Sequence, residues 1–168
     1  MKREMTTLDF IDRAVNLYED VIGMVSHEGA EFSYGEFNDR VNQLAHALAD
    51  VGVGQGDRVA MLAPNTHYFI EALYAANKLG ASFAPLNYRL TPEDYEYILN
   101  DCGADVVIAD YEYAEKVEEI RDEVPAGTFV GYRAEAIAGN WQDYEAFIGD
   151  CETVEPDRPT ISEDDEAT

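Results

Sequence analysis

The sequence of 168 residues has little cysteine and histidine, and each scarcity removes a class of site from consideration. Its two cysteines, Cys102 and Cys151, are too few and too far apart for a disulfide framework, and their spacing fits no zinc site. The three histidines fall on separate predicted elements, without the paired helical spacing of a metal site. We therefore expect neither a disulfide framework nor a metal centre.

Long apolar runs are also missing. No stretch approaches the roughly 20 apolar residues of a membrane-spanning helix, so we expect no transmembrane segment. The first ten residues, MKREMTTLDF, lack the apolar core of a signal peptide. Together these two absences favour a cytoplasmic protein.

Positive charge is scarce as well. Only 11 residues are Lys or Arg, against 35 Asp or Glu, which gives a formal net charge of −24. Such a chain is not expected to bind nucleic acid or anionic membranes, because both require cationic patches. The hydrophobic content of 46% and the 11 tyrosines nevertheless argue against disorder.

The acidic residues are spread along every predicted helix and are not confined to one tail. Repulsion between them becomes tolerable when salt shortens the Debye length, which is about 3 Å at 1 M. This distribution favours a salt-adapted protein, and we expect a halophilic, haloarchaeal source.

Hydrophobic periodicity predicts alternating strands and helices after a first helix at 8–20 and a hairpin whose turn lies at 27–30. The expected strands are 59–63, 81–86, 106–109 and 128–132. The expected helices are 34–51, 66–79, 92–102, 111–124 and a short one near 141–148. This order predicts an α/β fold: a mostly parallel sheet with helices on both faces, preceded by a helix and a short hairpin. Residues 1–150 form the expected domain, and 151–168 an acidic linker.

Local signals place several of the helix starts. Ser33 and Glu36 have the spacing of a capping box. Thr91 is suited to the N-cap position, and Pro92 to the first helical position. Thr7 is expected to cap the first helix. The apolar face predicted for that helix contains Leu8, Ile11, Val15 and Tyr18.

Four motifs follow one another along the chain: FSYGEF at 32–37, GQGDRVA at 54–60, LAPN at 62–65, and GASFAPLNYRLTPEDYEYILNDCGADVVI at 80–108. The last resembles the pattern G-A-x-x-x-P-L-N-x-R-L, followed by a helix and a strand. In this order and spacing, the motifs resemble the N-terminal domain of the AMP-forming acyl-CoA synthetase and ligase superfamily. The resemblance covers roughly residues 8 to 168.

That resemblance implies the N-terminal subdomain of the adenylate-forming ligase fold. It also implies an activity: ATP-dependent adenylation of a carboxylic or fatty acid, followed by thioester formation with CoA. The complete enzyme would use ATP, Mg²⁺ and CoA. The family's Ser/Thr/Gly-rich phosphate loop and catalytic lysine come later in its sequence. We therefore expect this chain to be inactive alone and to bind none of these ligands tightly.

Two further interpretations stay open at this point. The chain could be a catalytically inactive remnant, or one chain of a split enzyme that associates with a complementary chain or with itself. A parallel sheet interrupted here would leave apolar faces uncovered, which favours association. A third interpretation, a receiver domain, has only the loose resemblance of Val106–Asp110 to a phosphoacceptor strand. The acidic pair and the lysine that such a domain needs are absent at 62–65 and 129–132.

Arg89 is the one residue singled out as a ligand-binding candidate. It follows a predicted strand, at the edge where open α/β sheets bind ligands. The resemblance implies a place near the nucleotide phosphates of CoA, with which a guanidinium can form paired hydrogen bonds. The alternative from the residues alone is an ion pair with Glu93 or Asp94.

Overall fold

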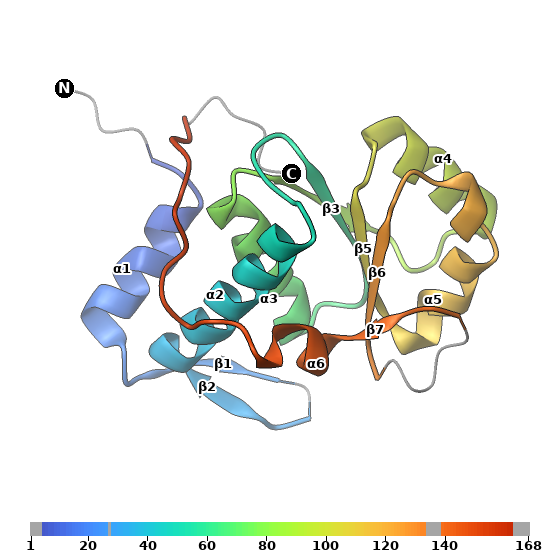
Figure 1. Cartoon of the computed structure of the whole chain (residues 1–168). Helices are drawn as coiled ribbons and strands as arrows, with labels where there is room; N and C mark the ends of the chain where they lie inside the picture. Colours follow the sequence, from blue (N-terminus) through green and yellow to red (C-terminus); the bar gives the residue numbers. More distant parts are fainter. Residues whose placement is uncertain (1–4, 27, 134–138, 163–168) are drawn as a thin grey trace.

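The computed structural model describes residues 5–26, 28–133 and 139–162 (Figure 1). The predicted turn residue His27 and the acidic residues 163–168 lie outside these ranges. The helices are α1 (Leu8–Tyr18), α2 (Tyr34–Asp50), α3 (His67–Lys78), α4 (Pro92–Cys102), α5 (Tyr111–Glu118), the short 3-10 helix η1 (Arg121–Glu123) and α6 (Tyr144–Gly149). The strands are β1 (Ile22–Val25), β2 (Glu31–Ser33), β3 (Arg58–Leu62), β4 (Ser82–Leu86), β5 (Val106–Asp110), β6 (Thr128–Tyr132) and β7 (Gln142–Asp143).

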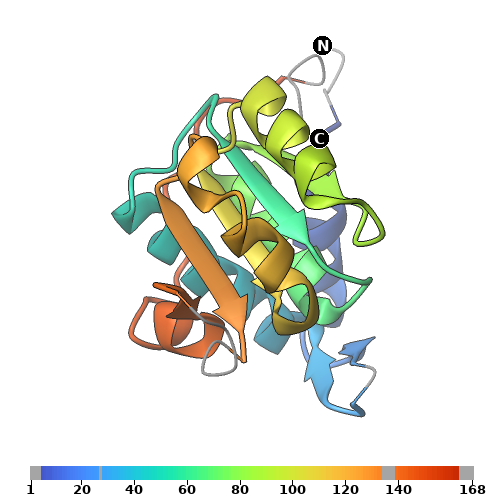
Figure 2. The same ribbon diagram turned by 90° about the vertical axis from the view of Figure 1, so that its right-hand side faces the viewer.

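The central feature is a five-stranded sheet in the order β4-β3-β5-β6-β7. Every neighbouring pair in it is parallel. Strands β1 and β2 form a separate antiparallel hairpin. Figure 2 looks at the sheet from the side of α4 and α5, which cover one of its faces. The predicted α/β fold with a mostly parallel sheet is confirmed.

Two apolar clusters fill the space on the two sides of the sheet. Residues of β5 alternate between them: Val106 and Ile108 belong to the cluster under α1, α2, α3 and α6, and Val107 and Ala109 to the cluster under α4 and α5. This is the alternation expected of a strand buried on both faces. The chain's own helices therefore cover the sheet, and the expectation of uncovered sheet faces is wrong.

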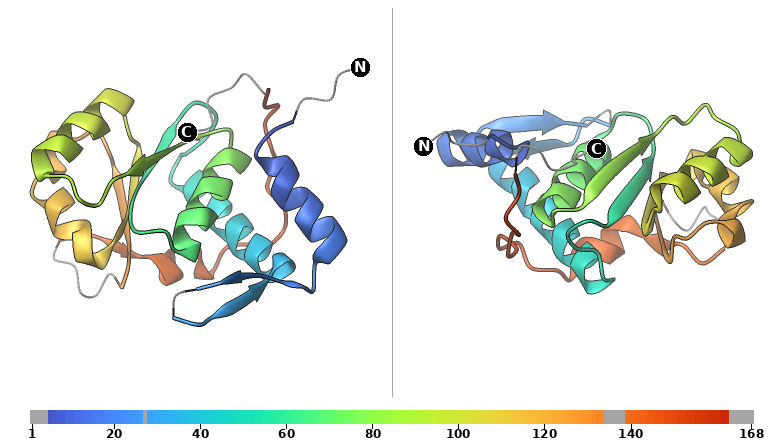
Figure 3. Two further views of the ribbon diagram at one scale, coloured as in Figure 1. Left: turned by 180° about the vertical axis from the view of Figure 1, so that it is seen from behind. Right: turned by 90° about the horizontal axis from the view of Figure 1, so that it is seen from above.

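Exposed apolar side chains occur elsewhere, on α1 and the hairpin. This part lies at the end of the molecule away from α4 and α5 (Figure 3). The exposed residues there, which we call the α1–β1 patch, are Phe10, Leu17, Tyr18, Val21, Ile22 and Val25. A group of this size on one element and its neighbour is typical of a surface that binds another apolar surface.

We therefore expect the chain to bind the dye ANS and to self-associate as its concentration rises, through the α1–β1 patch. Sedimentation velocity at several concentrations in molar KCl would measure this. Replacing Phe10 and Leu17 by serine should abolish both effects. Tyr97→Ser on α4 is the matched control, because Tyr97 is 70% exposed but distant from the patch. A dye-negative monomer at all concentrations would contradict this expectation.

The capping predictions hold for two helices. The hydroxyl of Ser33 accepts the N–H of Glu36 at 3.1 Å, and the Glu36 carboxylate accepts the N–H of Ser33 at 2.8 Å. At α4, Thr91 forms the equivalent reciprocal pair with Asp94. Each pair satisfies N–H groups that have no partner within the helix, so both starts are determined locally.

The first helix differs from its prediction. It ends at Tyr18, not at residue 20, and Tyr18 is 54% exposed instead of lying on the buried face. Thr7 makes no side-chain cap, because its hydroxyl donates to the Asn77 side chain of α3. A contact between residues distant in sequence has replaced the local one.

Residues 151–162 form no helix or strand, yet ion pairs attach them to the helices. The buried ammonium of Lys78 lies 2.8 Å from a carboxylate oxygen of Glu155. The guanidinium of Arg158 donates two hydrogen bonds of 2.7 Å to Asp12 of α1. The domain boundary at residue 150 stays a prediction.

Candidate functional site

The edge of the sheet at which a ligand is expected to bind can be located from the topology. Because strands β3 to β6 are parallel, their last residues, Leu62, Leu86, Asp110 and Tyr132, lie at one edge. The connection from β3 leads outward to β4, and α4 then carries the chain back across β3 to β5. Open α/β sheets bind ligands at this carboxyl edge, near such a reversal.

Arg89 lies at this edge, in the loop of residues 87–90 between β4 and α4. Its side chain is exposed, and its guanidinium carbon lies 5.4 Å from the centre of the Tyr88 ring. That ring in turn packs against Tyr113 of α5 at 5.1 Å. The guanidinium is therefore supported by an aromatic pair, as in a cation–π contact.

The alternative of an ion pair finds no support in the described part of the chain. No carboxylate of a described residue lies within ion-pair distance of the Arg89 guanidinium. The carboxylate of Asp94 instead accepts the N–H of Thr91 at 3.1 Å and its hydroxyl at 3.0 Å. Asp94 is thus engaged at the start of α4. This leaves the guanidinium as an exposed donor with a fork of N–H groups.

Hydrogen bonds fix the backbone that carries Arg89. The side-chain oxygen of Asn87 accepts the N–H of Arg89 at 3.0 Å, and the Asn87 carbonyl accepts the N–H of Leu90 at 3.2 Å. The same carbonyl accepts the hydroxyl of Tyr95 at 2.9 Å. Tyr95 is fully buried in α4. The loop therefore has a defined conformation.

Asp110, at the end of β5, is a buried polar group at this edge. One of its carboxylate oxygens accepts the hydroxyl of Tyr132 at 2.6 Å, and the other accepts the N–H of Glu112 at 3.0 Å. Burial, with a further contribution from Asp110, raises the pKa of Tyr132. One oxygen thus caps the start of α5, and the other binds the hydroxyl of the buried Tyr132.

The strand order equals the 2-1-3-4-5 order of flavodoxin-like folds, which receiver domains share. The chemistry of a receiver domain is nevertheless missing at this edge. Residues 63–65, which follow β3, contain no acidic pair, and the Asp110 carboxylate is engaged on both oxygens. The strand order alone therefore does not support a receiver domain, because the acidic pair is absent and the Asp110 carboxylate is engaged.

A partly buried ionic network joins α2, α3 and α6 on the face of the sheet away from α4 and α5. The Arg40 guanidinium donates to Glu71 at 2.6 Å and to Glu145 at 2.8 Å. The hydroxyl of Tyr144 donates to the Glu71 carboxylate at 2.7 Å. Burial raises the pKa of Glu71, and the Arg40 guanidinium opposes that rise. With its carboxylate fully buried and bonded from two sides, Glu71 connects three helices.

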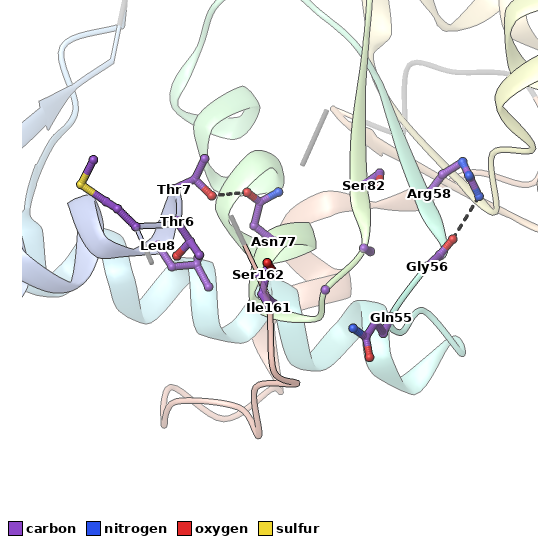
Figure 4. Close-up of a pocket in the computed structure, with 13 residues that line it drawn as sticks. Thr6, Thr7, Leu8, Gln55, Gly56, Arg58, Asn77, Ser82, Ile161 and Ser162 are labelled. Carbon is purple, nitrogen blue, oxygen red and sulfur yellow. Dashed lines mark hydrogen bonds between the residues drawn. The ribbon is translucent and has the colours of Figure 1, made fainter. Parts of the chain in front are cut away.

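A cavity of about 300 Å³ opens at the other edge of the sheet, where β3 and β4 begin (Figure 4). Its lining includes Arg58, Ser82 and Ser162. The Arg58 guanidinium donates to the Gly56 carbonyl at 3.0 Å, as the dashed line in Figure 4 marks. Because this cavity lies at the amino ends of the strands, it is separate from the site around Arg89.

Two general findings concern the described residues as a whole. Within these ranges no three His, Cys, Asp or Glu side chains converge in a way that could hold a metal ion. None of the helices there combines the length and the apolarity needed to cross a bilayer.

Sequence reasoning singled out Arg89 as a candidate, but it did not predict the residues that contact its side chain and its loop. Tyr88 and Tyr113 support its guanidinium, and Lys116 of α5 donates to backbone carbonyls of its loop. The available signal was the rarity of lysine, since only Lys2, Lys78 and Lys116 occur in the chain.

Comparisons with known proteins give a consistent result. The sequence profile of a family described as AMP-binding enzyme matches residues 11–168. Feruloyl-CoA synthase of Amycolatopsis sp is 42% identical over 107 residues, which are 61% of this chain and 22% of that protein. A long-chain-fatty-acid–CoA ligase of Thermus thermophilus is 32% identical over 153 residues, covering 89% of this chain and 28% of the ligase.

Solved structures show the same relationship in three dimensions. The anthranilate CoA ligase AuaEII, in complex with anthranoyl-AMP, has the same fold over 98% of this chain and 31% of its own, with a TM-score of 0.88 at 22% identity. The N-terminal domain of FACL13 from Mycobacterium tuberculosis matches 96% of this chain and 40% of its own, with a TM-score of 0.82 at 26% identity.

The chain spans about a fifth of the length of the first curated relatives, 22% of the feruloyl-CoA synthase. The sequence profile and the fold agree over almost all of its residues. The chain therefore belongs to the AMP-binding enzyme family and corresponds to the N-terminal part of its adenylate-forming CoA ligases.

Proposed function

We propose that this chain is the N-terminal part of an AMP-forming acid–CoA ligase. Such an enzyme activates a carboxylic or fatty acid with ATP and then transfers the acyl group to the thiol of CoA. The names of the relatives support this activity, because they include CoA ligases for aromatic and for fatty acids. The complete enzyme would use ATP and Mg²⁺, and CoA is the substrate that we assign to residues of this chain.

The exposed Arg89 guanidinium is the observation that carries the assignment to CoA. It lies at the carboxyl edge of the sheet, on a fixed loop, with no carboxylate of a described residue in ion-pair distance. The chain has only 11 basic residues against 35 acidic ones, so cations that could bind an anionic ligand are few. A guanidinium fork can bind two phosphate oxygens at once, and the nucleotide end of CoA supplies them.

Substitution of Arg89 tests this assignment. The test protein, called the joined enzyme below, is the Thermus thermophilus ligase with its matching N-terminal segment replaced by this chain. Arg89→Ala should raise the KM for CoA, because loss of a charge-assisted bond costs roughly 1.5–3 kcal/mol, or about tenfold to a hundredfold. The rate of adenylation, measured by pyrophosphate release, should stay near that of the enzyme with Arg89, since CoA takes no part in this half-reaction.

Arg13→Ala is the matched control, because Arg13 is exposed on α1, far along the chain from the loop. It should alter neither half-reaction. If Arg89→Ala instead lowers the melting temperature and slows both half-reactions together, Arg89 has a structural role and the assignment fails.

A second candidate function is supported by the α1–β1 patch. Its exposed apolar side chains suit an interaction module that associates with a complementary chain or with a second copy. The sedimentation and dye experiments above separate the two candidates, because the ligase proposal does not require the isolated chain to associate. We also propose that the protein works in a salt-rich cytoplasm, an idea supported by its net charge of −24.

A further inference from the structure

Lys116 connects α5 to the loop that carries Arg89. Its ammonium donates to the carbonyl of Leu90 at 2.8 Å and to the carbonyl of Tyr88 at 3.2 Å. It also lies 5.8 Å from the centre of the Tyr95 ring. The two carbonyls flank Arg89 in the sequence, so one side chain holds the backbone on both sides of the proposed ligand-binding residue.

The partners of Lys116 differ from those of Lys78, the other lysine in the described residues. In the ranges that the structure covers, no carboxylate lies within ion-pair distance of the Lys116 ammonium. By contrast, Lys78 forms an ion pair with Glu155. The charge of Lys116 is therefore not neutralised by a neighbouring carboxylate. It adds positive potential beneath the loop, where an anion would approach Arg89.

Side chains from α4 and α5 hold three backbone carbonyls of the 87–90 loop. Lys116 holds the carbonyls of Tyr88 and Leu90, and Tyr95 holds the carbonyl of Asn87. With these three carbonyls directed to α4 and α5, the Arg89 side chain extends over the Tyr88 ring at the surface. Sequence separations of 26 and 28 residues make this a tertiary contact, which the loop's own sequence does not supply.

We propose that Lys116 is a positioning residue for the CoA site: it fixes the 87–90 loop so that Arg89 faces the nucleotide phosphates. This inference rests on the proposed role of Arg89. A neutral, unbranched side chain of similar length, such as methionine, keeps most of the packing but cannot donate to two carbonyls. Arginine keeps the donors and the charge, which makes Lys116→Arg the conservative variant.

The first test measures the loop itself, in the 168-residue chain in molar KCl. In Lys116→Met the amides of Arg89 and Leu90 should exchange with solvent about tenfold faster, the effect of losing roughly 1.4 kcal/mol of local protection. The amide of Phe83 in β4 should be unaffected, and Lys116→Arg should restore slow exchange. Unchanged exchange at Arg89 and Leu90 in Lys116→Met overturns the proposal, whatever the enzyme assays show.

The second test is a double-mutant cycle on the CoA reaction of the joined enzyme. Lys116→Met should raise the KM for CoA about tenfold, leave adenylation unchanged, and be rescued by Lys116→Arg. Combined with Arg89→Ala, it should add little further loss, because Lys116 acts through Arg89. A role in general stability would lower both half-reactions and would not give this split between the KM for CoA and the adenylation rate.

The outcomes separate the two ideas. If Arg89→Ala weakens CoA use and Lys116→Met does not, the positioning role is overturned and the assignment of Arg89 stands. If the two losses add fully, Lys116 acts on the anion directly, which also overturns positioning. If Arg89→Ala has no effect on the KM for CoA, the proposed function of Arg89 fails first, and the inference about Lys116 fails with it.

Discussion

Replacing Glu71 by alanine is expected to lower the free energy of unfolding by about 3–5 kcal/mol, the range for a broken buried ion pair. The carboxylate is fully buried and accepts from Arg40 at 2.6 Å and from Tyr144 at 2.7 Å. Its removal leaves a largely buried guanidinium and a buried hydroxyl without this partner. The Tyr144 hydroxyl then has no bond to replace its lost hydration, and the Arg40 guanidinium keeps only its pair with the half-exposed Glu145, so the penalty exceeds the value of the pair itself.

Urea denaturation in molar KCl, followed by circular dichroism, would measure the loss as a lower midpoint. Glu115→Ala is the matched control, because Glu115 is exposed on α5 and should change stability by no more than about 0.5 kcal/mol. A Glu71→Ala midpoint equal to that of the control would show that the network contributes nothing to stability. Because the network joins α2, α3 and α6, its loss should leave the loop of Arg89 on the other side of the molecule unchanged.

Transfer from molar KCl into dilute buffer is expected to cause extensive loss of structure. The excess of 35 acidic over 11 basic residues creates repulsion throughout one small domain. The Debye length rises from about 3 Å at 1 M to about 30 Å at 0.01 M salt, so this repulsion acts across the whole molecule in dilute buffer. Ion pairs such as Lys78–Glu155 attach residues 151–162 to the helices, but they involve few of the carboxylates.

Circular dichroism and melting temperature across a KCl series would measure this dependence. A variant with Glu93→Gln, Glu96→Gln and Asp101→Asn removes three charges from the surface of α4 without touching the core, and it should retain structure at lower salt. Full folding in dilute buffer with an unchanged melting temperature would contradict the proposed adaptation to salt.

The sequence was sufficient where neighbouring residues determine the structure. The start of α2 follows from Ser33 and Glu36, and the bounds of α4 agree with the prediction because Thr91 and Pro92 mark its start. The β-strand pattern is equally local, since each of the four predicted strands is an apolar run within a regular alternation.

Contacts between distant residues explain what the sequence did not predict. The expected helix 111–124 ends at Glu118, where Arg121 turns to pack its guanidinium 3.9 Å from the centre of the Phe129 ring. Trp141 lies outside the last helix, because its indole packs against the same Phe129 and donates to Glu118 at 2.8 Å. The two-residue strand β7 exists only through its pairing with β6.

In the candidate site, too, local sequence predicts some features and contacts between distant residues determine the others. The position of Arg89 could be predicted, because a motif and the end of a strand lie together in the sequence. Only the structure shows that Arg89 is exposed and has no carboxylate partner among the described residues. From the sequence, an ion pair with nearby Asp94 was as plausible, but that carboxylate binds Thr91. Lys116 could not be assigned to the loop from the sequence, because it lies on α5 and the loop that it contacts precedes α4.

A crystal structure of the joined enzyme with CoA bound would test the central claim most directly. If this chain supplies the phosphate contact, the Arg89 guanidinium will lie within about 3 Å of a phosphate oxygen of CoA, the distance of a charge-assisted hydrogen bond. The ammonium of Lys116 will still contact the carbonyls of Tyr88 and Leu90. CoA bound with its phosphates away from the carboxyl edge of the sheet, and Arg89 facing solvent, would contradict the claim.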